Sequence, residues 1–305
     1  MSLVYDAIQN GGKIVPLLMP SIENDFPTYL NPSVFVDGDT IYCCIRNTNY
    51  IFTQANFEII YIINDNDKLF SRSWLCELDN NLDIINYKLI DTSNFDISPK
   101  HIFVGLEDCR IVKWEDKFYL TGVRRDVVSD GEGRIELSEI SDYKEISRVR
   151  INVPNYSYCE KNWMPILDMP YHFIKWTSPT EVVKVVDNNI DIVFLSDSPF
   201  KNYRGSSQVI RIGNYRIAII HITNVCINKI NSAFGQYNHK FIVWDLNWNI
   251  VCESDEFNFM DGKVEFCCGM AVYGNDILIT YAFQDSATYI LRMPINYLFK
   301  YLGLK

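Results

Sequence analysis

The sequence repeats one pattern five times, and this repeat restricts the possible folds more than any other feature. Each copy has small or cysteine residues, an apolar run, a short turn and a second alternating run rich in Val, Ile, Tyr and Phe, which is typical of a β-hairpin. The five copies cover residues 32–47, 109–125, 163–176, 206–221 and 267–283. A second hairpin is predicted after each copy, over residues 73–90, 134–151, 181–197, 240–257 and, with a weaker pattern, 287–302.

Two successive hairpins make a four-stranded antiparallel unit, and five units in 305 residues leave about 61 residues for each. That length suits propeller blades with insertions. Helical periodicity is found only at residues 3–10 and 297–305. We predict an all-β protein, a five-bladed β-propeller of four-stranded antiparallel blades with residues 1–305 as a single domain. A two-sheet sandwich or two small all-β domains would explain the repeat less well.

Composition narrows the function classes. Lys and Arg number 28 against 38 Asp and Glu, a net charge of -10 that repels nucleic acid but permits a local pocket for one small anion. No apolar stretch approaches the roughly 18 residues of a membrane span. The first twenty residues lack the pattern of a secretory signal. The nine cysteines include two adjacent pairs and no C-x-x-C motif, so we expect reduced thiols, no metal site and a cytoplasmic location.

Polar residues precede the first hairpin of every repeat. In a propeller the loops that enter the first strands gather at one end of the central channel. These loops carry Asn31, then Glu107 with Asp108, then Lys161 with Asn162, then Arg204, and finally Glu265. Converging charges are costly to desolvate unless they pair or perform chemistry. Ion pairs between blades, with Arg110 or Arg204 holding Glu107 and Glu265, are the structural alternative. We predict a functional site because acids and cations occur at the same end.

The run Glu107-Asp108-Cys109-Arg110 resembles the Glu-Asp-Pro-Arg segment of glycoside hydrolase family 130, the mannoside phosphorylases and mannosidases. Further matches follow in the same order along the chain: Asn31-Pro32-Ser33 with Arg46, Lys161-Asn162, Phe266 to Gly269, and Tyr281 with Asp285. The resemblance implies a five-bladed propeller. Cys109 stands where the family has Pro, which indicates a divergent branch.

The resemblance also implies roles for residues. It makes Asp108 the general acid, and it makes Asn31, Arg46 and Lys161 ligands of inorganic phosphate, the expected co-substrate, with Arg124 as a looser candidate. Inverting displacement needs an acid on the leaving oxygen and a nucleophile on the opposite face of the sugar, and phosphate arrives already anionic. We expect Glu107 and Glu265 to raise the pKa of Asp108 and Arg110 to oppose them.

Other residues are weaker candidates. Trp163 is the best aromatic platform for a sugar ring, and Asn162, Arg204 and Asp285 are candidate sugar ligands. His221 and His239 are equally well interpreted as site residues or as ordinary buried histidines. Residues 64–66 and 187–189 lack the closing Glu of a calcium loop, so we interpret them as solvated turns.

The leading hypothesis is an inverting glycoside phosphorylase that acts on β-mannosides, with no cofactor. The alternatives are a mannosyltransferase-like glycosyltransferase that uses a sugar phosphate or a nucleotide sugar, a β-mannosidase, and a non-catalytic glycan-binding propeller. The expected partners are an oligosaccharide or a sugar phosphate, without nucleic acid or a membrane span. A homo-oligomer is left open.

Overall fold

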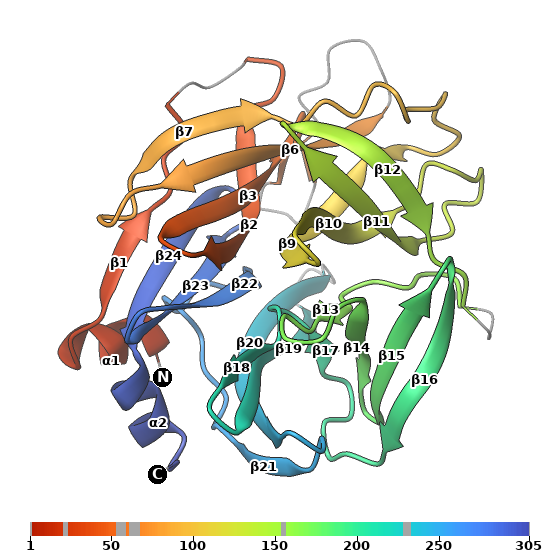
Figure 1. Cartoon of the computed structure of the whole chain (residues 1–305). Helices are drawn as coiled ribbons and strands as arrows, with labels where there is room; N and C mark the ends of the chain where they lie inside the picture. Colours follow the sequence, from red (N-terminus) through yellow and green to blue (C-terminus); the bar gives the residue numbers. More distant parts are fainter. Residues whose placement is uncertain are drawn as a thin grey trace.

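Five antiparallel sheets surround a common axis, and each is one blade of a β-propeller (Figure 1). The structure is a computed structural model that describes residues 2–20, 24–52, 59–60, 68–153, 157–227 and 233–304. This architecture confirms the predicted fold class. Residues 64–66, interpreted above as a turn, lie outside the described residues, whereas 187–188 form a turn between two strands.

The strands of each blade follow one another from the axis outwards. Blade 1 has β2 (Thr28–Asp37), β3 (Thr40–Thr48), β6 (Leu69–Leu78) and β7 (Ile84–Leu89), and β8 (Phe103–Val104) runs parallel to β6. Blade 2 has β9 (Leu106–Trp114), β10 (Lys117–Arg124), β11 (Arg134–Ser141) and β12 (Lys144–Arg150). Blade 3 has β13 (Met164–Pro165), β14 (His172–Thr177), β15 (Thr180–Val186) and β16 (Asn189–Ser196).

Blades 4 and 5 depart slightly from this scheme. In blade 4 the inner position is shared by β17 (Arg204–Gly205) and β18 (Ile210–Ile212), followed by β19 (Tyr215–Ile227), β20 (Ala233–Asp245) and β21 (Ile250–Glu253). Blade 5 has β22 (Glu265–Tyr273), β23 (Asp276–Phe283), β24 (Ala287–Pro294) and β1 (Lys13–Pro16). A short pair, β4 (Ile51–Phe52) with β5 (Ile59–Ile60), lies outside the blades.

The fifth blade corrects one sequence prediction. Residues 287–302 were expected to form its outer hairpin, but only β24 is a strand, and Ile295–Tyr301 form the helix α2. The outer strand is β1, from the other end of the chain, and it pairs antiparallel with β24. The last blade therefore joins the N-terminal and C-terminal parts of the chain, and α1 (Leu3–Gln9) and α2 lie beside it (Figure 1).

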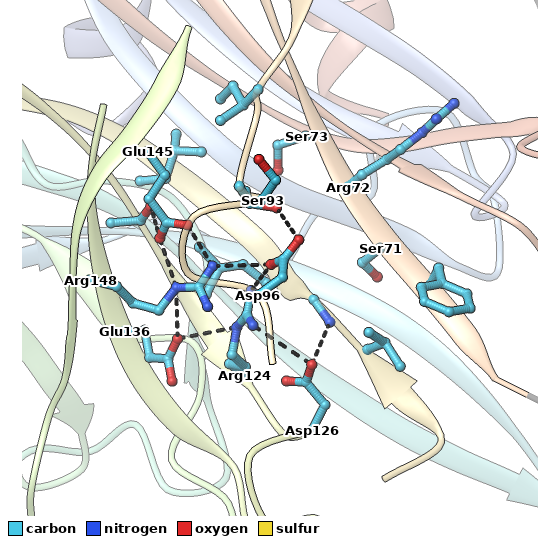
Figure 2. Close-up of a pocket in the computed structure, with 18 of the residues that line it drawn as sticks. Ser71, Arg72, Ser73, Ser93, Asp96, Arg124, Asp126, Glu136, Glu145 and Arg148 are labelled. Atoms are coloured by element: carbon cyan, nitrogen blue, oxygen red, sulfur yellow. Dashed lines mark hydrogen bonds and ion pairs between the residues drawn. The ribbon is translucent and has the colours of Figure 1, made fainter. Parts of the chain in front are cut away.

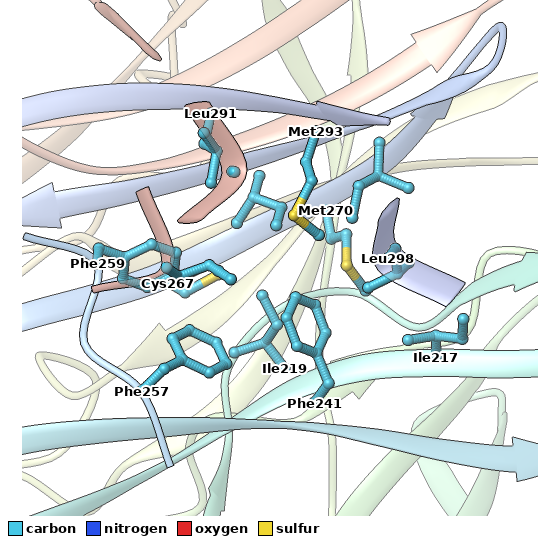
Figure 3. Packing of buried hydrophobic residues seen from close by; sticks show 14 of the residues in the cluster. Ile217, Ile219, Phe241, Phe257, Phe259, Cys267, Met270, Leu291, Met293 and Leu298 are labelled. Carbon is cyan, nitrogen blue, oxygen red and sulfur yellow. The ribbon is translucent and has the colours of Figure 1, made fainter. Parts of the chain in front are cut away.

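Buried apolar side chains fill the spaces between blades. The described residues form five clusters, one at each interface between neighbouring blades. The cluster between blades 4 and 5 includes Phe241, Phe257 and Met270 and extends to Leu298 of α2 (Figure 3). Successive residues of a strand point to opposite faces of its sheet, and neighbouring blades cover both faces of the inner strands. Both faces must therefore be apolar, which explains the near-continuous apolar runs in the sequence.

A buried glutamine joins four blades at the axis. Gln208, between β17 and β18, donates from Nε2 to the carbonyls of Val34 and Ile111, each at 2.9 Å, and its Oε1 accepts the N–H of Met270 at 2.9 Å. These partners belong to blades 1, 2 and 5. Gln208 is fully buried, so its three bonds form away from competing water and hold the inner strands together.

The eight cysteines whose side chains are described are free thiols. No helix among the described residues is long and apolar enough to cross a membrane.

Candidate active site

A cavity of about 730 Å³ opens on the axis at the end where the inner strands begin. Strands of several blades contribute polar side chains to its wall. Those predicted from sequence that line it are Asn31, Arg46, Glu107, Asp108, Lys161, Asn162, Arg204, His221 and Asp285. Residues as far apart in the sequence as Asn31 and Asp285 therefore meet in one cavity.

Asp108 and Arg46 form the central contact of this cavity. Arg46 Nη1 donates to Asp108 Oδ1 at 2.7 Å, and Asn31 Nδ2 donates to the same oxygen at 2.6 Å. Arg46 is itself held in place, because Nε donates to Ser71 Oγ at 2.9 Å and Nη2 donates to Tyr50 Oη at 2.7 Å. Ser71 and Tyr50 thus fix one arginine of blade 1 against a carboxylate of blade 2.

Bulges at the start of two inner strands aim these side chains at the axis. Between the pairs Leu30–Arg46 and Ser33–Cys44, β2 has one residue more than β3, and β9 has one more than β10 around Asp108. A bulge turns a side chain out of the regular alternation. Asn31 and Asp108 have positive φ angles of 47° and 53°, in a region that non-glycine residues rarely occupy and that is frequent at functional sites.

Two glycines make room for this backbone. A Cβ on Gly122 would lie 2.4 Å from the carbonyl oxygen of Glu107, opposite the bulge of β9. A Cβ on Gly205 would lie 2.2 Å from the carbonyl oxygen of Asn162, another lining residue with a positive φ, 62°. Any larger residue at either position would displace the strand that carries a site residue.

The carboxyl groups of the cavity differ in their pKa. Burial would raise the pKa of Asp108, but Arg46, Arg110 and the hydrogen bonds from Asn31 and Arg46 outweigh it, so the pKa lies below its usual value. This reverses the raised pKa expected from the sequence. Burial raises the pKa of Glu107, although Arg46 opposes it. Burial and the nearby Asp108 raise the pKa of Asp285 to about 6.

One wall of the cavity is aromatic. The imidazole of His221 stacks on the ring of Tyr237 with centroids 5.7 Å apart and meets Phe266 edge-on at 5.0 Å. Burial, with His239 and Arg110 nearby, lowers the pKa of His221, so its ring is neutral at physiological pH. The wall combines apolar ring faces with polar edges, a surface that suits a sugar.

Glu265 does not line this cavity, contrary to the sequence prediction. Its Oε1 accepts the N–H groups of Met260 and Gly262, each at 2.8 Å, and its Oε2 accepts the N–H of Phe259 at 2.5 Å. Its side chain is fully buried, and burial raises its pKa. Backbone donors, rather than the expected arginines, hold this carboxylate. Glu265 therefore fixes the segment that leads into β22.

The structure also separates Arg124 from the other predicted phosphate ligands. Arg124 lines a second cavity, of about 530 Å³, between blades 1 and 2 (Figure 2). Its Nε lies 3.2 Å from Glu136 Oε2 and its Nη1 lies 3.7 Å from Asp126 Oδ2. Side chains of β10 alternate between the face towards blade 3, as Tyr119 does, and the face towards blade 1, as Leu120 does. Arg124, at the end of β10, takes the direction of Leu120.

Two aromatic candidates are core residues. Trp163 is buried, donates from Nε1 to Glu160 Oε2 at 3.0 Å and packs edge-on against Phe173, so it is not a platform in the cavity. His239 is fully buried and stacks on Phe257 with centroids 5.8 Å apart. Burial lowers the pKa of His239 to about 3, so this ring is neutral.

The sequence reasoning missed several residues of the cavity wall, chiefly Tyr50, Thr223 and Tyr237. Tyr50 lies just beyond the end of β3, Thr223 lies in the second half of β19, and Tyr237 lies in the first half of β20. Because a hairpin returns the chain to the end where it started, such positions come back to the same rim as the inner strand starts. Polar residues at these returning ends were the available signal.

Among the described residues, no cluster of three or more His, Cys, Asp or Glu side chains is arranged to hold a metal ion.

The fold and the cavity define a class: a five-bladed propeller whose axial cavity holds an aspartate against an arginine and an asparagine. No protein-family profile and no curated protein matches the sequence. Solved structures do match. One is a β-1,2-mannobiose phosphorylase from Listeria innocua in complex with β-1,2-mannobiose, 13% identical over 96% of this chain and 97% of its own, with a TM-score of 0.59.

A second is a mannose phosphorylase from Leishmania mexicana in complex with phosphate, 12% identical over 97% of this chain and 93% of its own, with a TM-score of 0.53. A third is a structure from the GH130 family of mannoside phosphorylases, described as containing glycoside hydrolases that target β-1,2 mannosidic linkages, with 11% identity, coverage of 87% and 84%, and a TM-score of 0.57. These structural neighbours are mannoside phosphorylases and hydrolases, and the chain shares their propeller fold at 11–13% identity.

Proposed function

We propose that the protein is an inverting glycoside phosphorylase that acts on β-mannosides. One observation carries the proposal: Arg46 and Asn31 meet on Asp108 Oδ1 in the axial cavity, which unites the expected acid with two expected phosphate ligands. The neighbours in complex with β-1,2-mannobiose and with phosphate support the same substrate classes.

In the proposed reaction Asp108 gives a proton to the glycosidic oxygen, and that oxygen leaves with the electron pair of the broken C–O bond. A phosphate oxygen forms the new bond on the opposite face of the sugar, so a β-mannoside gives α-mannose 1-phosphate. Arg46, Asn31 and the exposed Lys161 would orient the phosphate, since guanidinium and amide N–H groups match its oxygens. His221, Asn162, Arg204 and Asp285 are then available to the sugar hydroxyls.

Product analysis tests this proposal directly. The protein is incubated with β-1,2- or β-1,4-mannobiose with and without phosphate, and the products are followed by ³¹P and ¹H NMR. Phosphate-dependent release of α-mannose 1-phosphate is expected. A matched pair of variants serves as control: Asp108→Asn should be inactive, whereas Asp276→Asn, which changes an ion pair with Arg292 at the other end of blade 5, should remain active. Free mannose in equal yield with and without phosphate would reject phosphorolysis.

A hydrolase is the second candidate, because Glu107 and Asp285 line the same cavity as Asp108. Inverting hydrolysis needs a carboxylate base that activates water. Asp285, with a pKa of about 6, would carry out that step when deprotonated. If mannose is the product, Asp285→Asn should lose turnover and regain it with added azide, which needs no base. Persistent hydrolysis in that variant would assign the base to Glu107.

A further inference from the structure

In the axial cavity two of the expected phosphate ligands, Arg46 and Asn31, already bind the carboxylate of the expected acid, Asp108. Asp108 Oδ1 accepts hydrogen bonds from Arg46 Nη1 at 2.7 Å and from Asn31 Nδ2 at 2.6 Å. The other nitrogens of Arg46 are engaged by Ser71 and Tyr50, and Glu107 Oε2 lies 3.7 Å from Nη2. An anion that approaches Arg46 and Asn31 therefore meets a carboxylate in its place.

We propose that the anionic co-substrate and the carboxylate of Asp108 compete for Arg46 and Asn31, so that anion binding releases Asp108 to take up the proton that it later transfers. This inference rests on the proposed phosphorolysis. It assigns a second role to Arg46, which positions the acid as a carboxylate in the free protein and exchanges it for the anion when the substrate binds.

The proton balance is simple. In the free protein Asp108 is a carboxylate, since its two charge-assisted partners hold the pKa below its usual value against the effect of burial. Loss of those bonds and the charge of the neighbouring anion both favour protonation. The proton comes from solvent, stays on the carboxyl group, and passes to the leaving oxygen when the glycosidic bond breaks, which returns Asp108 to the carboxylate that Arg46 can bind again after the product departs.

Other charged groups around Asp108 do not replace this exchange. The backbone carbonyl of Asp108 accepts Nη1 of Arg110 at 2.7 Å, and Arg110 donates twice more to the carbonyl of Ser206, so its guanidinium remains in place. The titratable and charged groups that face Asp108 from the surrounding blades are Arg46, Tyr50, Glu107, Cys109, Arg110, Lys161, Tyr237, Cys268 and Asp285. Burial raises the pKa of two other carboxyl groups in the cavity, Glu107 and Asp285, so an experiment must separate both from Asp108.

Calorimetry with sulfate measures the coupling. Sulfate resembles phosphate in shape and charge but carries no proton to exchange near neutral pH, so any proton taken up on binding enters the protein. Sulfate is titrated into the whole protein at pH 6 to 8 in two buffers that differ in ionisation enthalpy. We expect uptake approaching one proton for each sulfate, and an affinity that falls with rising pH by up to tenfold per unit.

Three matched variants assign the proton. Asp108→Asn should abolish the uptake and tighten sulfate binding by about tenfold because the competing carboxylate is gone. Asp285→Asn and Glu107→Gln should each keep the uptake. Thermal unfolding confirms that the variants are folded; if one is not, the wild-type titration still rejects the exchange when sulfate binds without proton uptake.

Each contrary outcome has a defined meaning. Sulfate binding without proton uptake rejects the exchange but leaves phosphorolysis standing. Uptake that is kept in Asp108→Asn and lost in Asp285→Asn or in Glu107→Gln also rejects it, because the proton would belong to that other carboxyl group. If neither sulfate nor phosphate binds, the exchange and the phosphorolysis are both rejected.

Discussion

Blades 1 and 2 carry two groups of arginines and carboxylates, one in the axial cavity and one between the blades, and the two groups differ in their roles. In the axial cavity Arg46 and Asn31 meet Asp108 on bulged strands, with backbone in the left-handed region. In the cavity between the blades Arg124 and Arg148 are surrounded by the carboxylates of Asp96, Asp126, Glu136 and Glu145 (Figure 2). The two groups contain the same residue types.

The difference lies in how the charges are satisfied. The carboxylate of Glu136 lies within 4.0 Å of three arginines, Arg124, Arg148 and Arg150. That network compensates itself and joins the strands of blade 2 to the segment that carries Asp96. In the axial cavity the exposed Lys161 and Arg204 add positive charge, and their side chains face the opening. The axial group therefore differs in the exposed cations on its wall, whereas Arg124 and Arg148 lie among carboxylates.

Asp108→Asn should give the largest effect. The substitution keeps the shape of the side chain and removes the transferable proton, so turnover should fall at least about 10²-fold while the fold is retained. Initial rates with saturating mannobiose and phosphate measure this, with circular dichroism as the check on folding. Retained turnover would move the acid to Glu107 or Asp285.

Arg124→Met should break the network between the blades. Removing one partner of a buried ion pair leaves an uncompensated charge, here on the buried Asp126, and costs about 3–5 kcal/mol. Urea unfolding should show this loss, while the phosphate KM of the folded fraction stays at the wild-type value. A selective rise in the phosphate KM would return Arg124 to the phosphate site.

The same substitution in the axial cavity, Arg46→Met, should differ from Arg124→Met in its effect on phosphate. Loss of a charge-assisted contact of roughly 1.5–3 kcal/mol should raise the phosphate KM about 10- to 100-fold, with a much smaller change in the sugar KM. Steady-state kinetics in both substrates distinguish these effects. Equal changes in the two KM values would contradict a phosphate role.

Asp285→Asn should change the pH dependence of stability. Because the pKa of Asp285 is about 6 in the folded state and near 4 when unfolded, the folded state binds more protons between these values, and stability falls as the pH rises through this window. The variant should match the wild type below pH 4 and have a higher Tm above pH 6. Parallel Tm curves across this range would show that the carboxyl of Asp285 is not desolvated.

Much of this architecture is predictable from local sequence. The five copies of the hairpin pattern predict the five blades because strand alternation and turn residues are local signals, and the polar residues before each copy predict six residues of the cavity wall. The closing strand β1 was missed because it comes from the opposite end of the chain, and four residues that pair only with β24 carry no signal of that partner.

What sequence alone determined is therefore the repeat, the class of fold and the identity of the polar residues at one rim. Tertiary structure decided the direction of each side chain. Glu265 and Asp108 both lie near the start of an inner strand, yet backbone N–H groups hold Glu265 inside the protein and a bulge aims Asp108 at the axis. Arg46 and Arg124 both lie near the end of a second strand, yet one meets Asp108 and the other Glu136. Direction depends on bulges, on strand alternation and on partners tens of residues away, so it is fixed only when the blades pack together.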